Sequence, residues 1–354
     1  MSNGRLESAI NSVVNSIESG SKTERNIIIT MQYLGFDGNG GTSMEEAGKP
    51  HGLTRESVRQ ITNRVCADLK PRGSALIELK EAIEITDALL PSAAEDLEIA
   101  LINAGYISTG FKIEGIINAA NVFGIKTKME QIVKLNGKRF ITSEKHIDIP
   151  KKVQSKATKE ISHNGAVSID LLTEEVPGLS QENKIIFVNR VIDSLGSVSW
   201  IDKENGWFYF DGKGRNRLLA RLRKIFAVMK KVQIADLRSG VERSWNKNIK
   251  DHSSVLPAEV MVKLITTCGE FKIEQGGFVT SLAVFDAAEE LRPFEQAIVD
   301  FIKNKETGTS REKELEDNLV INAQDKFNFS MALNYSPLIL KKERGVYALV
   351  GTPI

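Results

Sequence analysis

Residues 42–65 read TSMEEAGKPHGLTRESVRQITNRV and predict a helix, a tight turn and a second helix. Met44 and Ala47 form the inner edge of the first helix, which is short. Gly52 suits the turn because a residue without Cβ adopts left-handed backbone conformations at low cost. Leu53 supplies the apolar side chain that fills the space between the helices. The stretch therefore predicts a helix-turn-helix.

The second helix begins after Thr54, whose side chain suits an N-cap. Val58, Ile61 and Val65 recur at helical spacing, so we expect them to face the core. The polar residues between them then point outward near the start of the helix; they are Arg55, Glu56, Arg59 and Gln60, followed one turn later by Arg64.

In a helix-turn-helix, the side chains near the start of the second helix enter the major groove of DNA. Arginine binds guanine O6 and N7 with two hydrogen bonds, glutamine pairs with adenine, and glutamate accepts a hydrogen bond from cytosine. We therefore predict that the residues in contact with DNA are Thr54, Arg55, Glu56, Arg59, Gln60 and Arg64. The alternative is a helix-turn-helix that makes protein contacts alone.

The segment from Arg25 to Val65 resembles region 4 of the sigma-70 family, the region that recognises the promoter −35 element. The most specific part is GLTRESVRQI at residues 52–61, similar to the family pattern Gly-(Leu/Val)-Thr-Arg-Glu-Arg-(Val/Ile)-Arg-Gln-Ile. Residues 33–38, YLGFDG, resemble the family's turn before the helix-turn-helix. The resemblance implies a DNA-contact role for Arg55, Glu56, Arg59 and Gln60.

The chain departs from the family pattern at three positions. Ser57 stands where the family has arginine, Ala47 replaces a larger aliphatic residue, and Pro50 lies near the end of the first helix. The resemblance covers about 40 of the 354 residues, and nothing in the chain resembles the aromatic-rich promoter-melting region of a sigma factor. An autonomous sigma factor is therefore not expected.

The composition is that of an ordinary globular protein, with 41% hydrophobic and 26% charged residues, and the length predicts more than one domain. The formal net charge of +1 means that any affinity for DNA must come from local patches. Cys66 and Cys268 are the only cysteines, and residues 1–5 begin no apolar signal peptide, so a cytoplasmic location is expected. No apolar run approaches the ~20 residues that span a bilayer, so no membrane partner is expected.

A pattern of helices followed by a short apolar hairpin occurs four times after residue 70, which is the order of a winged helix. The predicted hairpins lie at residues 132–141, 198–210, 271–279 and 338–350, at intervals of about 65 to 75 residues, each with glycine at its turn. The helices expected before them are Ser74–Leu89, Ala93–Ala104, Lys112–Phe123, Ile169–Val176, Lys184–Leu195, Arg217–Met229, Ile234–Ser244 and Pro257–Thr267, with a further unit starting near Pro293. Ser92 and Gly105 are expected to cap the second of these helices.

The predicted fold class is mainly α with short β-hairpins, an α+β protein. The predicted domains are a helix-turn-helix at 1–70 and winged-helix-like units at 71–149, 150–212, 213–281 and 282–354. The alternative is a larger α+β domain with several hairpins. Lys151–Ser162 is interpreted as a linker or an amphipathic helix, and breaks or loops are expected at Lys247–Ser254 and Lys303–Lys313.

Residues 213–231 hold eight basic residues and no acidic one. An apolar stripe at helical spacing (Leu218, Leu222, Ile225, Phe226 and Met229) predicts one amphipathic helix with its basic residues on the opposite face. We expect Arg217, Arg221 and Lys224 to contact DNA phosphates without reading sequence. The alternative is a helix whose charges meet acids of a neighbouring unit.

The remaining clusters give weaker functional signals. The aromatic residues at 200–210 fit core packing better than stacking on bases, and Lys134, Lys138 and Arg139 on the first hairpin are candidate phosphate contacts. Neither cysteine has a partner at zinc-ligand spacing, and the histidines are scattered. No metal site, cofactor or enzyme activity is therefore predicted.

The predicted function is that of a sequence-specific protein that binds double-stranded DNA, acting as a transcription regulator. One alternative is an adaptor that docks on RNA polymerase, because region 4 of sigma factors also does so. Another is the DNA-recognition subunit of a defence or DNA-processing complex. The oligomeric state is not predicted.

Overall fold

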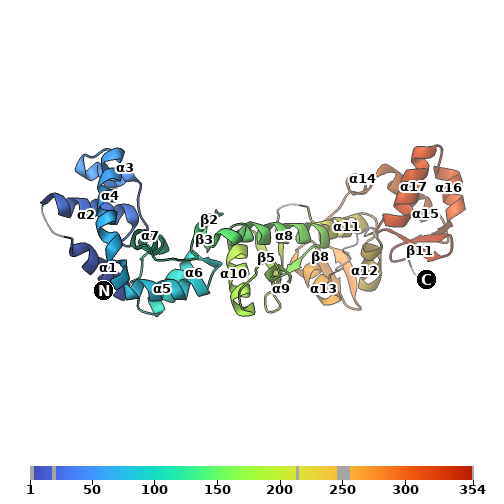
Figure 1. The fold of residues 1–354 in the computed structure, drawn as a ribbon. Coiled ribbons are helices and arrows are strands. Elements are labelled where there is room, and N and C mark those ends of the chain that lie inside the picture. The colour runs from blue at the N-terminus through green and yellow to red at the C-terminus, as the bar shows by residue number, and fades with distance from the viewer. Residues whose placement is uncertain (1–3, 18–20, 213–214, 245–255, 353–354) are drawn as a thin grey trace. The chain divides into compact units, whose positions relative to one another are not determined.

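The computed structural model describes residues 4–17, 21–212, 215–244 and 256–352. The chain is mainly helical, with four small antiparallel sheets, so the predicted fold class is confirmed (Figure 1). It divides into an N-terminal unit, Met1–Gln154 with Leu172–Gly196, and a C-terminal unit, Ser155–Leu171 with Ser197–Ile354.

The N-terminal unit begins with the helices that contain the predicted helix-turn-helix. They are α1 (Arg5–Asn15), α2 (Ser21–Leu34), α3 (Met44–Gly48), the 3-10 turn η1 (Lys49–His51), α4 (Arg55–Leu69) and the 3-10 turn η2 (Lys70–Ala75).

After η2, the order helix, strand, helix, helix, strand, strand occurs four times in the described part of the chain. The first repeat is α5 (Ile77–Ala88), β1 (Ser92–Ala93), α6 (Ala94–Asn103), α7 (Ile113–Phe123), β2 (Gln131–Leu135) and β3 (Lys138–Thr142). The second, after η3 (Glu144–His146), is α8 (Ile149–Asn164), β4 (Val167–Ser168), α9 (Ile169–Thr173), α10 (Gln181–Asp193), β5 (Val198–Asp202) and β6 (Trp207–Phe210).

The third repeat is α11 (Arg217–Phe226), β7 (Lys231–Gln233), α12 (Ile234–Arg243), α13 (Ala258–Thr267), β8 (Phe271–Glu274) and β9 (Phe278–Ser281). A short helix, α14 (Ala287–Glu290), leads to the fourth, which is α15 (Pro293–Lys303), β10 (Thr309–Arg311), α16 (Glu312–Leu319), α17 (Ala323–Tyr335), β11 (Ile339–Glu343) and β12 (Val346–Leu349).

Each repeat forms one three-stranded sheet with its last strand in the centre, in the orders β1-β3-β2, β4-β6-β5, β7-β9-β8 and β10-β12-β11. All four predicted hairpins are therefore confirmed. In the first, Leu135 pairs with Lys138 across Asn136 and Gly137, which both have positive φ (48° and 84°) as a tight hairpin turn requires. The sequence did not predict the first strand of each sheet, because two or three residues are too few to show alternation.

The structure corrects the predicted N-cap of α6 and decides between the two interpretations of residues 151–162. Ser92 does not cap α6: it lies in β1, paired with Ile141, and the N-cap residue is Ala93, which has no side-chain cap hydrogen bond. Gly105 follows the helix with φ 75°, as expected. Lys151–Ser162 lies within helix α8, so of the two interpretations the helix is right. Residues 303–313 contain the end of α15, a turn and β10, whereas 247–254 lie outside the described residues.

One apolar core continues from the first helices into the first repeat, across the boundary predicted at residue 70. Val65 and Leu69 of α4 belong to the same buried cluster as Leu6 and Ile10 of α1, together with apolar residues of α5, α6 and α7. The chain passes close to α7 just after α4, because a Cβ at Gly73 would lie 2.4 Å from the carbonyl oxygen of Phe123. The helix-turn-helix and the first repeat are therefore parts of one folded body.

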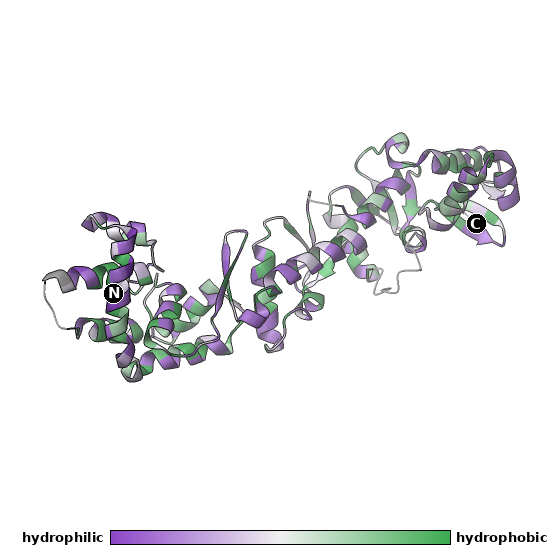
Figure 2. Ribbon diagram, turned by 45° about the horizontal axis from the view of Figure 1, so that its top comes forward, coloured by the Kyte–Doolittle hydropathy of each residue, from purple (hydrophilic) through white to green (hydrophobic). Residues whose placement is uncertain are grey.

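Neighbouring repeats are joined inside each unit by paired charges and packed rings. In the N-terminal unit, Arg190 of α10 binds Asp96 of α6 through both oxygens, and Phe187 packs edge-on against Phe140 with ring centroids 5.6 Å apart. Figure 2 shows apolar and polar residues alternating along the helices, as expected of elements with one buried and one exposed face.

In the C-terminal unit, Lys263 of α13 pairs with Asp202 of β5 at 2.5 Å. Helix α12 approaches the fourth repeat so closely that a Cβ at Gly240 would lie 2.4 Å from the carbonyl oxygen of Pro337. These contacts join the second repeat's hairpin to the third repeat, and the third repeat to the fourth.

Candidate nucleic-acid interface

The first helix of the helix-turn-helix, α3, begins with a reciprocal cap. The Glu46 backbone N–H donates to Ser43 Oγ at 3.2 Å, and the Ser43 backbone N–H donates to Glu46 Oε2 at 2.9 Å. Such a capping box satisfies backbone N–H groups at both of its positions, which allows so short a helix to form. The Glu46 carboxylate accepts from the Ser43 backbone N–H and also from the Ser43 hydroxyl, and these two hydrogen bonds hold the pKa of Glu46 below its usual range.

The turn between α3 and α4 depends on two glycines. A Cβ at Gly48 would lie 2.7 Å from the carbonyl oxygen of Leu53 and 2.8 Å from Val58 Cγ2, so only glycine fits at this crossing. Gly52 has φ 65°, the left-handed conformation expected of it from the sequence. Ala47 and Val58 form a small buried cluster with Ile29 of α2, against which Met44 and Leu53 pack, as predicted.

Helix α4 has the predicted N-cap and a slightly different buried face. The Ser57 backbone N–H donates to Thr54 Oγ1 at 3.3 Å. Val58 and Val65 are buried as expected, but Ile61 is only half-buried. Two further residues of the helix are buried that the pattern did not predict, Thr62 and Leu69. Periodicity counts apolar residues alone, so a buried threonine at the right spacing gives no signal.

The five predicted reading side chains on α4 are all exposed; they are Arg55, Glu56, Arg59, Gln60 and Arg64. Arg55 is 74% exposed and lies 3.6 Å from Glu45 of α3, a loose surface pair that costs little to break. The structure therefore brings these side chains together on one outward face of the second helix.

Glu56 organises two of its neighbours. Its carboxylate accepts hydrogen bonds from Arg59 Nε at 2.8 Å and Nη2 at 2.7 Å, and from Gln60 Nε2 at 3.0 Å. The hydrogen bonds from Arg59 and then Gln60 lower the pKa of Glu56 from 4.5 to about 2. Glu56, Arg59 and Gln60 thus form one hydrogen-bonded group on the exposed face of α4, which we call the fan. The hydrogen bonds that hold the fan together are those between these three side chains.

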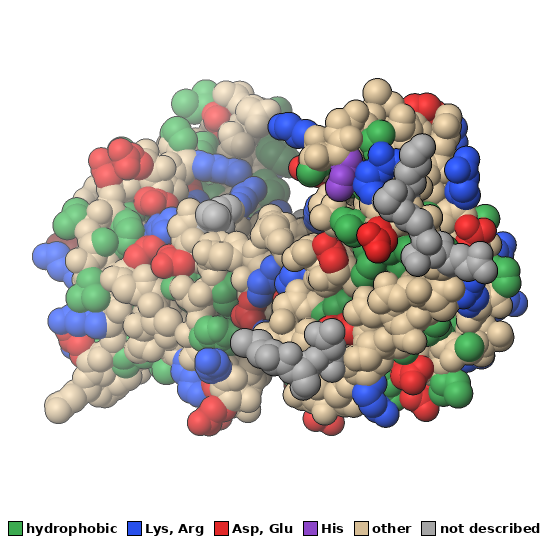
Figure 3. Space-filling model, turned by 90° about the vertical axis from the view of Figure 1, so that its left-hand side faces the viewer, with side chains coloured by type: hydrophobic (Ala, Val, Ile, Leu, Met, Phe, Trp, Pro, Cys, Tyr) green, Lys and Arg blue, Asp and Glu red, His purple; other side chains and the backbone are tan. Residues whose placement is uncertain are grey.

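Positive and negative side chains are mixed on the face of the molecule that Figure 3 presents. Lys and Arg side chains are interspersed with Asp and Glu there, in keeping with a net charge of +1. Any affinity for phosphate beside α4 therefore depends on local groups of basic residues rather than on the whole surface.

The basic helix α11 does not present its charges as the sequence predicted. Lys224 pairs at 2.6 Å with Glu295 of α15, and the two side chains are only 21% and 6% exposed. Arg223 binds both carboxylate oxygens of Glu270. The expectation that Lys224 lies on an open basic face is therefore wrong. For Lys224 the alternative holds, because Glu295 belongs to the neighbouring repeat.

The two other predicted residues of α11 are half-buried. Arg217 Nη1 lies 3.0 Å from His163 Nδ1, and Arg221 donates to the carbonyl oxygens of Ser244 and Arg217 at 3.1 and 3.3 Å. Burial and the neighbouring arginines lower the pKa of Arg221 to about 10. Contact of Arg217 and Arg221 with phosphate stays a prediction.

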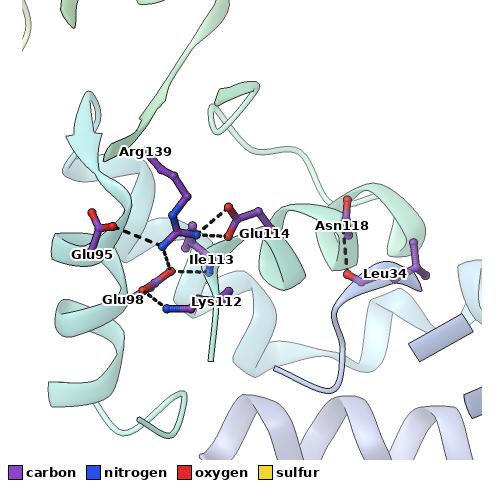
Figure 4. Close-up of polar contacts among 8 residues, drawn as sticks. All are labelled: Leu34, Glu95, Glu98, Lys112, Ile113, Glu114, Asn118 and Arg139. Carbon is purple, nitrogen blue, oxygen red and sulfur yellow. Dashed lines mark hydrogen bonds and ion pairs between the residues drawn. The ribbon is translucent and has the colours of Figure 1, made fainter. Parts of the chain in front are cut away.

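Arg139 of the first hairpin is also committed to the protein (Figure 4). Its guanidinium donates to Glu114 at 2.6 Å and to Glu98 at 2.9 Å, and it lies 3.6 Å from Glu95. Glu98 accepts in addition from the backbone N–H of Ile113 at 3.1 Å. This network fixes the hairpin to α6 and α7, so the interpretation of Arg139 as a phosphate contact is corrected.

The aromatic residues of the second hairpin pack as structural residues. Phe208 and Tyr209 are buried, and the Trp200 and Phe208 rings meet edge to face with centroids 5.6 Å apart. Core packing, the interpretation preferred from the sequence, therefore describes Phe208 and Tyr209.

The described residues contain neither a cluster of metal ligands nor a helix able to cross a membrane. In this part of the chain, no group of three or more His, Cys, Asp or Glu side chains could hold a metal ion. Within the same residues, none of the helices combines the length and the apolar character needed to cross a membrane. No family model, curated protein or solved structure matches the chain.

Proposed function

We propose that this protein binds double-stranded DNA sequence-specifically through α3 and α4 and acts as a transcription regulator. The observation that carries the proposal is the face of α4, where arginine, glutamate and glutamine side chains project together from the start of the second helix of a helix-turn-helix. This is the part of such a unit that enters a major groove. The resemblance to sigma-70 region 4 assigns the same residues to DNA contact.

Recognition follows from the donors and acceptors on this face. Arg59 has the planar fork that binds guanine O6 and N7, and Gln60 has the amide that pairs with adenine N6 and N7. In the free protein, both side chains donate to Glu56. On DNA, their donors exchange this carboxylate for base edges, and Glu56 becomes available to accept from cytosine N4.

Titration of purified protein against duplexes tests the proposal. A motif is first selected from random duplexes, and Arg59→Ala and Gln60→Ala are then compared on the selected and a scrambled sequence. Each variant should lose roughly 1 to 3 kcal/mol on the selected duplex and little on the scrambled one. Arg344→Ala, an exposed arginine of the fourth hairpin, is the matched control. Equal losses on both duplexes would show that Arg59 and Gln60 do not read bases.

A second candidate is an adaptor that docks on RNA polymerase. A protein partner is favoured by the exposure of two large apolar side chains in the fourth repeat. Ile321 is 90% exposed and Phe327 is 60% exposed. Gel shift with the purified protein alone separates the two candidates. Retardation of the selected duplex without polymerase supports the first, and retardation that requires polymerase and is lost in Phe327→Ala supports the second.

A further inference from the structure

Seven lysines lie between residues 126 and 152, in and around the first hairpin. They are Lys126, Lys128, Lys134, Lys138, Lys145, Lys151 and Lys152, and the name lysine surface is used for these seven residues. In the hairpin, Lys134 lies opposite Arg139 and Lys138 lies opposite Leu135, so the two lysines flank the hairpin on its two faces. The same stretch contains only three acidic residues, Glu130, Glu144 and Asp148. Its one arginine, Arg139, is already neutralised by Glu98 and Glu114.

These lysines differ from Arg223 and Lys224 of α11 because their ammonium groups are not used in ion pairs within the described part of the protein. All are exposed except Lys138, which is half-buried. In the described part of the chain, the lysines that form ion pairs lie elsewhere; they include Lys112, Lys224, Lys231, Lys263, Lys272, Lys305 and Lys326. The nearby carboxylate of Asp87 accepts from the Thr127 hydroxyl and the Lys128 backbone N–H, not from a lysine ammonium.

The lysine surface belongs to the same folded body as the helix-turn-helix. The hairpin is fixed to α6 and α7 by Arg139, and α7 shares its buried core with α4. Asn118 of α7 also donates to the carbonyl oxygen of Leu34, at the end of α2, at 2.9 Å (Figure 4). In Figure 2 the β2–β3 hairpin projects from the N-terminal unit with hydrophilic residues along its outer part. The spacing between the lysines and α4 is therefore set by a packed core.

We propose that the lysine surface binds the phosphate backbone of the same DNA duplex whose bases α4 reads. Lysine suits this role because it offers a compact point charge for phosphate, without the planar fork that arginine directs at bases. The net positive charge of the stretch suits a polyanion as its partner. It argues against the binding of a cation by the three carboxylates. The inference rests on the proposed function and places backbone anchoring on these lysines.

The test uses the full chain and two quadruple variants that lower the net charge equally. The first replaces Lys134, Lys138, Lys151 and Lys152 with glutamine. The control replaces Lys203, Lys303, Lys313 and Lys341 with glutamine; these are exposed lysines of the C-terminal unit and form none of the ion pairs above. Affinities of both variants and the unaltered protein are measured on the selected and scrambled duplexes over a range of KCl concentrations.

Neutralisation of the lysine surface should weaken binding to both duplexes by a similar factor, about tenfold or more. It should also flatten the plot of log affinity against log salt by about 0.9 for each phosphate that is no longer neutralised, up to about 3.6 for four phosphates. The control should change the slope little. Replacing the same four lysines with arginine should restore the slope, and pairwise variants (Lys134 with Lys138, Lys151 with Lys152) serve if the quadruple variant melts early.

The outcomes separate this inference from the proposed function. If the unaltered protein reads a motif through Arg59 but the first variant keeps the slope of the control, the lysine surface is a solvated face and the inference fails alone. If the unaltered protein retards no duplex even at low salt, the proposed function fails and the inference falls with it.

Discussion

The guanidinium of Arg59 donates to both carboxylate oxygens of Glu56, at 2.8 Å from Nε and 2.7 Å from Nη2, one turn apart on the exposed face of α4. The pair holds the proposed base-reading side chain in one orientation before DNA is bound. The two donors that bind Glu56 must leave this carboxylate before they can bind the edge of a base. The same pair makes the geometry of the proposed interface measurable in the free protein.

Titration of Glu56 should report that geometry. Hydrogen bonds from Arg59 and Gln60 lower its pKa to about 2 from a usual 4.5. Because the folded-state pKa is depressed, the stabilisation is present above the unfolded value and is lost as the pH falls through the folded one. A carboxyl carbon NMR titration should therefore give a midpoint near 2, rising toward 4.5 in Arg59→Ala and by less in Gln60→Ala. A midpoint near 4.5 in the unaltered protein would mean that the fan does not form in solution.

Gly48→Ala should destabilise the helix-turn-helix. The new Cβ would lie 2.7 Å from the Leu53 carbonyl oxygen and 2.8 Å from Val58, so α3 and α4 must move apart. Overpacking of this kind costs typically about 1 to 3 kcal/mol, and we expect a lower urea midpoint together with weaker DNA binding. Gly52→Asn is the control, because nothing lies within 4 Å of a Cβ there and asparagine tolerates the left-handed backbone. Equal stability of Gly48→Ala and the unaltered protein would contradict the observed crossing.

Removal of one partner of the Lys224–Glu295 pair should be costly. Both side chains are largely buried, and Ser336 donates a further hydrogen bond to Glu295. Glu295→Ala leaves an ammonium without its counter-charge, which costs about 3 to 5 kcal/mol, whereas the double variant Lys224→Met/Glu295→Leu should recover much of the loss. Glu316→Ala breaks the exposed pair with Lys326 and should cost less than about 1 kcal/mol. Chemical denaturation checks all three, and a small loss in Glu295→Ala would show that the repeats are not joined through this pair.

A fragment that ends at residue 70 should fail to fold. Leu6, Ile10, Val65 and Leu69 are buried against α5, α6 and α7, which this fragment lacks. A fragment of residues 1–196 contains all of the N-terminal unit and should fold. Amide NMR spectra should show dispersed resonances for 1–196 and collapsed ones for 1–70. Dispersed spectra from the short fragment would show that α1–α4 form an independent core.

Local chemistry allowed the sequence to predict most elements of this protein. The cap at Thr54, the left-handed Gly52 and the apolar spacing of Val58 and Val65 each depend on residues within one or two turns. The four hairpins were predictable for the same reason, since alternation and a turn glycine are local signals. The outward face of α4 followed directly, because a helix with one apolar face must present the other.

Tertiary structure alone decided which charged residues remain available. In the sequence, Lys224 and Arg139 cannot be distinguished from basic residues that remain exposed and unpaired. In the folded protein, Lys224 pairs with Glu295, and Arg139 pairs with Glu98 and Glu114. It also decided that the core crosses residue 70, since Leu6 and Leu69 come together only when α1 and α4 pack on the first repeat. Pairing and burial join residues distant in the chain, and periodicity, which senses only neighbours along a helix or strand, carries no information about them.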